Sequence, residues 1–153
     1  MKTAEINTNS HVLLRATLTA GVLDALAAIV VYYLFFHYNP VQVYQFVASA
    51  LLGPQAYKGG LPVALLGLFF HFFIAFAASL VFYMAYPRIP FLAKHYILSG
   101  LGYGLLIWLV MNLLVLPLTK IPAAPFDEVS VIAILWHMLL VGLPVSVIIH
   151  KNK

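Results

Sequence analysis

Apolar residues occupy long stretches of this chain, and polar residues interrupt them only briefly. Four of these stretches, residues 13–37, 61–86, 96–118 and 129–149, are each long enough to cross a bilayer. A membrane-spanning helix needs about 20 mostly apolar residues, at a rise of about 1.5 Å each. The pattern therefore predicts an all-α polytopic membrane protein: a single domain, residues 1–153, with four transmembrane helices in an antiparallel bundle.

A shorter segment between the first two spans, residues 40–52, carries its own helix signals. Asn39 suits the N-cap and Pro40 suits the first helical position. A Gly-Pro pair at residues 53–54 is a stop signal. The apolar and polar side chains of this segment lie on opposite faces, and it is too short to span a membrane. We therefore expect a short amphipathic helix at the outer membrane interface.

Composition narrows the class of protein further. Of the 153 residues, 64% are hydrophobic and only 8% are charged, whereas soluble domains carry about 25% charged residues. A water-soluble fold is thereby excluded. The chain has no cysteine, which also excludes disulfides, thiolate metal sites and a cysteine nucleophile.

The positive charges indicate the orientation in the membrane. Six of the eight lie on one side: Lys2, Arg15, Arg88, Lys94, Lys151 and Lys153. Lys58 and Lys120 lie on the other side. Because cytoplasmic loops are enriched in Lys and Arg, both termini are predicted to be cytoplasmic. The cations are scattered over helix ends and form no basic face, so a lipid bilayer is the predicted partner and nucleic acid is not.

Each predicted span offers one strongly polar residue within a layer about 10 Å thick: Asp24, His71, Asn112 and His137. Counted inward from the external ends, their depths run from about 9 Å for Asn112 to about 20 Å for Asp24. An aspartate at the centre of a span costs about 2.5–3.5 kcal/mol on insertion scales, and an ionisable residue in the membrane is by default a functional hypothesis. These four residues are therefore the candidate polar site, which we expect to be one connected cluster.

Helical spacing predicts where His71 points. The residues three, four or seven positions away on its face are small: Ala64, Gly67, Ala75 and Ala78. The opposite side carries larger residues: Phe69, Phe72, Phe73, Phe76 and Leu80. Small residues allow membrane helices to approach closely, whereas large apolar ones can face lipid. His71 is thus predicted to point into the bundle, and Gly100 and Gly104 are predicted to serve close helix packing.

Three functions are compatible with these polar residues. In the first, an Asp24–histidine pair exchanges a proton, and the site serves a proton, an ion or a small solute. In the second, His71 and His137 are the axial ligands of a haem, or with Asp24 form a two-histidine, one-carboxylate metal site. In the third, the chain is a membrane scaffold or partner subunit that acts through its small-residue stripes.

Sequence motifs do not favour the second function. No P-loop, dinucleotide fingerprint or HExxH motif is present, so the chain is not predicted to be an enzyme, and no haem or metal cofactor is predicted. For Asn112 a structural role is favoured, because interhelical hydrogen bonds of about 0.6 kcal/mol are common in membrane proteins. A homo-oligomer is compatible with the first and third functions.

Three segments carry a family resemblance: GGLPVALLGLFFHFFIAF, YPRIPFL and GLGYGLLIWLVMNLLVLPLT. With them, residues 13–120 resemble a group of small bacterial four-helix membrane proteins of unknown function. The resemblance implies a location in the bacterial inner membrane. It implies no activity, substrate or site.

Overall fold

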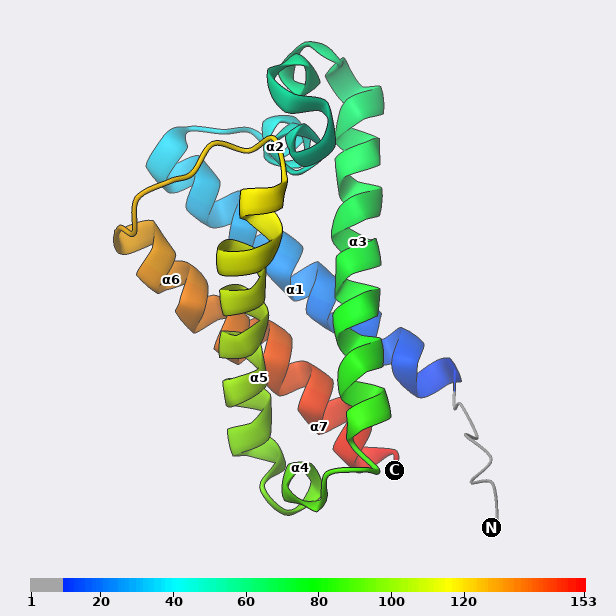
Figure 1. Ribbon diagram of the computed structural model, residues 1–153. Helices are drawn as coiled ribbons and strands as arrows, with labels where there is room; N and C mark the ends of the chain where they lie inside the picture. The colour runs from blue at the N-terminus through cyan, green and yellow to red at the C-terminus, as the bar shows by residue number, and fades with distance from the viewer. Residues whose placement is uncertain (1–9) are drawn as a thin grey trace.

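The computed structural model describes residues 10–153, which are almost entirely helical (Figure 1). Four long helical segments are each long and apolar enough to span a membrane: Ser10–Phe36, Gly60–Ala85, Tyr96–Leu118 and Glu128–Lys151. The predictions of an all-helical fold and of four such segments are confirmed. Lys2, which contributed to the predicted orientation, lies outside the described residues.

The first two long segments are continuous α-helices, and the last two are interrupted. The continuous ones are α1, Ser10–Phe36, and α3, Gly60–Ala85. The third segment consists of α5, Tyr96–Val110, the π-helical turn η2, Met111–Val115, and the 3-10 turn η3, Leu116–Leu118. The fourth consists of α6, Glu128–Trp136, the π-helical turn η4, His137–Gly142, and α7, Leu143–Lys151.

Three short helices complete the chain: α2, Pro40–Leu52, η1, Gly53–Lys58, and α4, Pro90–Lys94. The start of α2 is a capping box, in which the Asn39 side chain accepts from the Gln42 N–H and the Gln42 side chain accepts from the Asn39 N–H, both at 3.0 Å. At its end Gly53 has φ 66°, a conformation that glycine adopts at little cost. The helix signals read from the sequence are confirmed at both ends.

α2 packs against the first half of α3 and is not an isolated interfacial helix. Gln45 and Ser49, on its polar face, are buried rather than exposed, and Gln45 donates to the backbone carbonyl of Gly60 at 3.1 Å. A Cβ on Gly67 would overlap the carbonyl oxygen of Tyr44. The contact is therefore backbone to backbone, and glycine at position 67 permits it.

Glycine also brings the third and fourth long segments together. A Cβ on Gly104 would overlap the carbonyl of His137, and a Cβ on Gly142 would overlap the carbonyl of Gly100. The prediction that Gly100 and Gly104 serve close packing is confirmed. This crossing places η4 directly beside α5, as small residues allow between membrane helices.

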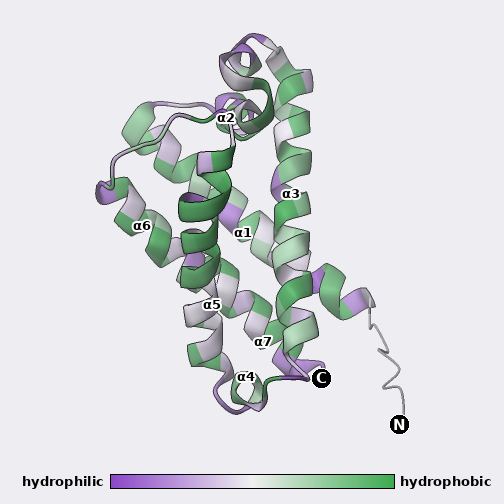
Figure 2. Ribbon diagram, in the orientation of Figure 1, coloured by the Kyte–Doolittle hydropathy of each residue, from purple (hydrophilic) through white to green (hydrophobic). Residues whose placement is uncertain are grey.

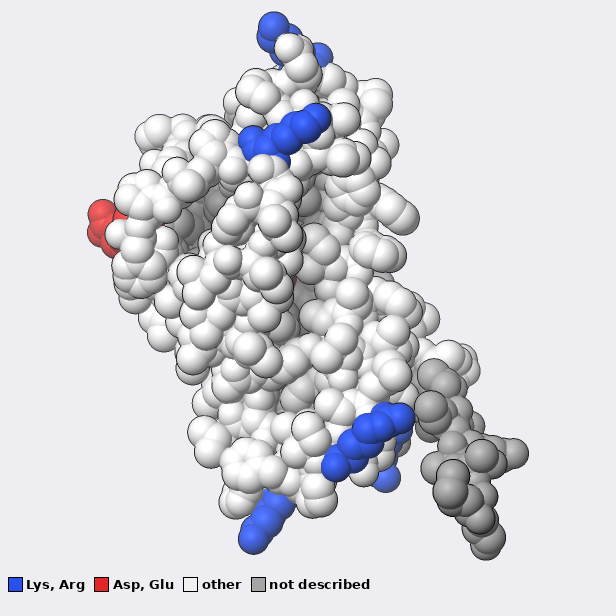
Figure 3. Space-filling model, viewed as in Figure 1, with Lys and Arg blue, Asp and Glu red and all other residues white. Residues whose placement is uncertain are grey.

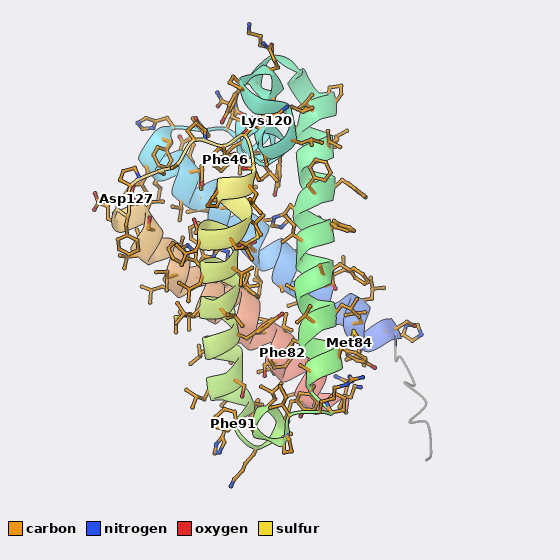
Figure 4. All side chains as sticks on the ribbon, in the orientation of Figure 1. Phe46, Phe82, Met84, Phe91, Lys120 and Asp127 are labelled. Atoms are coloured by element: carbon orange, nitrogen blue, oxygen red, sulfur yellow. The ribbon has the colours of Figure 1, made fainter. Side chains whose placement is uncertain are left out.

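The two ends of the molecule are packed differently. At the end that carries α4 and the C-terminus, a core of large residues such as Phe82 and Ile149 is closed to solvent (Figures 1 and 4). Hydrophobic residues cover the outward faces of the long helices, and hydrophilic ones gather mainly at the helix ends (Figure 2). Towards α2 the helices enclose a cavity instead, and this half holds the candidate site.

The outward side of α3 agrees with the sequence prediction only in part. Phe69 and Phe73 are 63% and 60% exposed, and Phe76 is also exposed. The prediction was wrong for Phe72 and Leu80, which are partly buried. Phe72 turns inward because α1 offers Gly21 opposite it, where an added Cβ would lie 2.6 Å from the phenylalanine ring.

Candidate functional site

The structure brings three of the four candidate residues together. Asp24 of α1 lies between His71 of α3 and His137 of η4: its Oδ2 is 3.8 Å from His71 Nδ1, and its Oδ1 is 3.9 Å from His137 Nε2. The relative exposures of the Asp24, His71 and His137 side chains are 22%, 11% and 16%. One carboxyl group therefore faces two imidazoles in a largely enclosed position. We call these three residues the acid–histidine cluster.

Trp136, at the end of α6, holds the carboxyl group in place and was not identified from the sequence. Its indole N–H donates to Asp24 Oδ1 at 2.8 Å. Its ring also stacks on that of His137, with centroids 5.4 Å apart. A buried tryptophan in an apolar span needs an acceptor for its N–H. The sequence therefore indicated that Trp136 has an acceptor nearby, but not which residue supplies it.

Backbone carbonyls define the protonation of the two histidines. His71 Nε2 is 2.8 Å from the carbonyl oxygen of Gly21, and His137 Nδ1 is 2.7 Å from that of Ala133. A carbonyl only accepts, so each of these nitrogens carries a hydrogen. In a neutral imidazole the other nitrogen then has no hydrogen. In both histidines that other nitrogen is the one that faces Asp24.

Whether the two histidine contacts attract Asp24 depends on where the hydrogens lie. Without an added proton, an ionised Asp24 would face two nitrogen lone pairs, and neither contact would be attractive. A proton on either imidazole, or on the carboxyl group, makes at least one contact attractive. At 3.8 and 3.9 Å the contacts exceed hydrogen-bond length and lie at ion-pair distance.

The cluster lies next to irregular helix geometry. His137 begins the π-helical turn η4, and Asn112 lies in the other π-helical turn, η2. Each turn is followed by a leucine and then a proline, Pro144 and Pro117. Proline lacks an N–H and its ring clashes with the carbonyl four residues earlier, so the preceding turn widens. Such π-turns occur frequently at functional sites.

Asn112 does not join the cluster. Its side-chain amide donates to the carbonyl of Trp108 in its own helix, at 2.9 Å. His137 makes the equivalent bond to Ala133, four residues before it. In both π-turns a polar side chain thus takes up a carbonyl four residues earlier, which is a structural role. Asn112 nevertheless lies on the wall of the cavity beside the cluster.

That cavity is large and mostly apolar. Its volume is about 1020 Å³, and it extends from the acid–histidine cluster to α2 and to the connection between η3 and α6. Its apolar walls include Phe46, Phe70, Ile74, Trp108, Met111 and Phe126. Phe46 and Asp127, both on its wall, lie towards the α2 end of the molecule (Figure 4). Ligand pockets are typically about 300–1,000 Å³ and apolar with a few polar groups, so the dimensions suit a small organic molecule.

The charged residues on the cavity wall are both acidic. They are Asp24 and Asp127, and neither Lys nor Arg lines the cavity. Asp127 is the N-cap of α6, where the backbone N–H of Ser130 donates to it at 2.9 Å and lowers the pKa of its carboxyl group. Its charge is therefore kept at neutral pH. In Figure 3 the acidic atoms lie apart from the basic ones, which occupy the two ends of the molecule.

Metal-ligand geometry is not found in residues 10–153. No group of three or more His, Asp or Glu side chains in this range is arranged to hold a metal ion. The same holds for the acid–histidine cluster. The histidine nitrogens that could bind a haem iron both face Asp24. Comparisons with known protein families, with curated proteins and with solved structures found no match to this chain.

Proposed function

We propose that this chain is a multi-pass protein of the bacterial inner membrane whose acid–histidine cluster binds a proton during the movement of a proton, an ion or a small solute. The four apolar segments support the membrane location. In the membrane they would form an antiparallel bundle, with α2 near the outer surface and both termini in the cytoplasm. The orientation is supported by the positive charges, which gather at the two ends of the molecule (Figure 3). Arg88, Lys94, Lys151 and Lys153 belong to the end with α4 and the C-terminus, whereas Lys58 ends η1 and Lys120 bonds to α2 at the other end.

One observation carries the proposal. Two imidazoles from different helices present to the same carboxyl group the nitrogen that carries no hydrogen in the neutral ring, while their other nitrogens donate to backbone carbonyls. A purely structural histidine in a membrane helix would satisfy both nitrogens within the fold. Here one side of each ring is left to interact with a proton shared with Asp24.

Depth supports the same function. Asp24 lies about 20 Å and His71 about 15 Å from the outer ends of their spans, at a rise of about 1.5 Å per residue. In a hydrocarbon layer about 30 Å thick, the cluster would be near the middle. Ionisable groups at this depth are typical of substrate and proton pathways.

Infrared difference spectroscopy during a pH jump would test proton binding directly in protein reconstituted into lipid vesicles. We expect a carboxyl signal from Asp24 together with imidazole signals, because the proton is shared. Asp24→Asn should remove the carboxyl signal and alter the imidazole signals. Asp127→Asn should remove only the signal of the exposed Asp127 carboxylate, and should leave the Asp24 carboxyl signal and the imidazole signals unchanged.

Identical difference spectra for the unmodified protein and Asp24→Asn would contradict the proposal. In that case Asp24 does not exchange a proton, and the cluster serves only to hold α1, α3 and η4 together.

A further inference from the structure

We propose that the cavity binds an amphipathic organic cation, an apolar body that carries one positive charge, and that binding displaces a proton from the acid–histidine cluster. This inference rests on the proposed function and names the class of solute for the same site. It is carried by the cavity walls, their charges and the position of Asp24.

The walls favour an apolar body. Most lining residues are aliphatic or aromatic, among them Phe46, Phe70 and Phe126. A small hydrophilic ion would leave most of this surface without a partner. An apolar molecule of a few hundred Å³ would fit within the cavity and cover part of this surface favourably.

The charges favour a cation. The wall carries the carboxylates of Asp24 and Asp127 and no Lys or Arg, and its basic side chains are the two cluster histidines, His71 and His137. An anion would be repelled by both carboxylates.

Competition with protons follows from the position of Asp24. The titratable groups that face it are His71 from α3 and His137 from η4, and its charge also acts on Tyr32 of α1 and Tyr44 of α2. Neither tyrosine is an ion-pair partner. When a cation with one charge enters, the proton shared by the cluster can leave. The net charge of the site is then unchanged, and one proton is released for each cation bound.

Two ions of matched size separate charge from apolar partitioning: tetraphenylphosphonium and tetraphenylborate. Neither titrates, so any pH dependence belongs to the protein. Binding would be measured by calorimetry on detergent-solubilised protein, with empty micelles as the baseline. We expect saturable binding of tetraphenylphosphonium and none of tetraphenylborate.

The pH dependence tests the exchange. Because protons compete, binding should be weaker at low pH and should strengthen by up to about 10-fold per pH unit as pH rises. In weakly buffered solution, binding should release a proton. Asp24→Asn should weaken binding at least about 10-fold and abolish the release. Glu128→Gln changes a carboxylate next to Asp127 that does not line the cavity, and it should change nothing.

Asp24→Glu is the control for a folding defect in Asp24→Asn. It keeps the carboxyl group, so both the proton release and the preference for the cation should remain. Equal binding of the two ions, or binding unaffected by Asp24→Asn, would overturn the inference. Failure to bind tetraphenylphosphonium while the infrared signal of Asp24 is present would overturn this inference and leave the proposed function standing. Absence of both signals would overturn both.

Discussion

Asp24 is held by three side chains that make different demands on it. Trp136 donates its N–H to Asp24 Oδ1. This bond persists whenever Oδ1 itself carries no hydrogen. His71 and His137 attract it only when a proton is present on their side or on the carboxyl group. The tryptophan is therefore the constant partner, and the histidines are the conditional ones.

Trp136→Phe tests this division of roles. The substitution keeps most of the ring but removes the only N–H donor that reaches Asp24 Oδ1 in the described chain. We expect a loss of about 1–3 kcal/mol in the free energy of unfolding, because a partly buried acceptor loses its partner. Thermal unfolding in detergent would measure it, and infrared spectroscopy would show a changed Asp24 signal.

Trp108→Phe is the matched control. Trp108 is buried and lines the same cavity, and in the described chain its ring contact is with Phe126 rather than Asp24. It should leave the Asp24 signal unchanged. A Trp136→Phe protein whose Asp24 signal matched that of Trp108→Phe would show that the indole N–H has no influence on the cluster.

The crossing of α5 and η4 positions His137 at the scale of secondary structure. Gly104 lies against the carbonyl of His137, and Gly142 lies against Gly100. The packing of η4 against α5 therefore helps to position His137, whose Nε2 lies 3.9 Å from Asp24. Gly100 and Gly104 act on the cluster in this way although they do not contact Asp24 itself.

Gly104→Ala should separate this crossing, because the new Cβ would overlap backbone atoms of His137 and Met138. We expect a loss of about 1–3 kcal/mol from overpacking, and a smaller proton release on cation binding because His137 moves away from Asp24. Thermal unfolding and the calorimetric assay would measure the two effects.

Gly102→Ala provides the control within the same segment. A Cβ on Gly102 would have nothing within 4 Å, so removal of a mid-helix glycine should stabilise the protein by about 0.5–1 kcal/mol. If both substitutions had the same effect, helix propensity rather than the α5–η4 contact would control stability here.

The whole molecule divides into a closed half and an open half. The large buried side chains lie near α4 and the C-terminus, and the cavity lies near α2 (Figure 1). In the proposed orientation the closed half is cytoplasmic and the cavity lies in the outer half, with Asp127 and Asp24 on its wall.

The absence of cysteine allows the orientation to be tested with single cysteines. Lys58→Cys and Lys120→Cys should react with a membrane-impermeant maleimide on intact spheroplasts, in which the outer face of the inner membrane is accessible. Lys94→Cys and Lys151→Cys should react only after the membrane is opened. The reverse pattern would place the cavity on the cytoplasmic side and contradict the positive-charge argument.

The sequence by itself determined the local features of this protein. Apolar length predicts four membrane-length helices, and the Asn39–Pro40 signal predicts the start of α2, because both depend on residues that are close in the chain. Small residues around His71 indicated correctly that it faces other helices. The depth estimates also placed Asp24, His71 and His137 in one layer.

Only the tertiary structure decided which side chains meet within that layer. Depth follows from counting residues, but the rotation and crossing of each helix follow from contacts made elsewhere, such as Phe72 over Gly21 and Gly104 against η4. The widened turn η2 and the bond from Asn112 to its own helix keep Asn112 out of the cluster. The same dependence on packing brings Trp136 to Asp24, because hydrophobic periodicity does not specify which helix supplies a partner for a buried N–H.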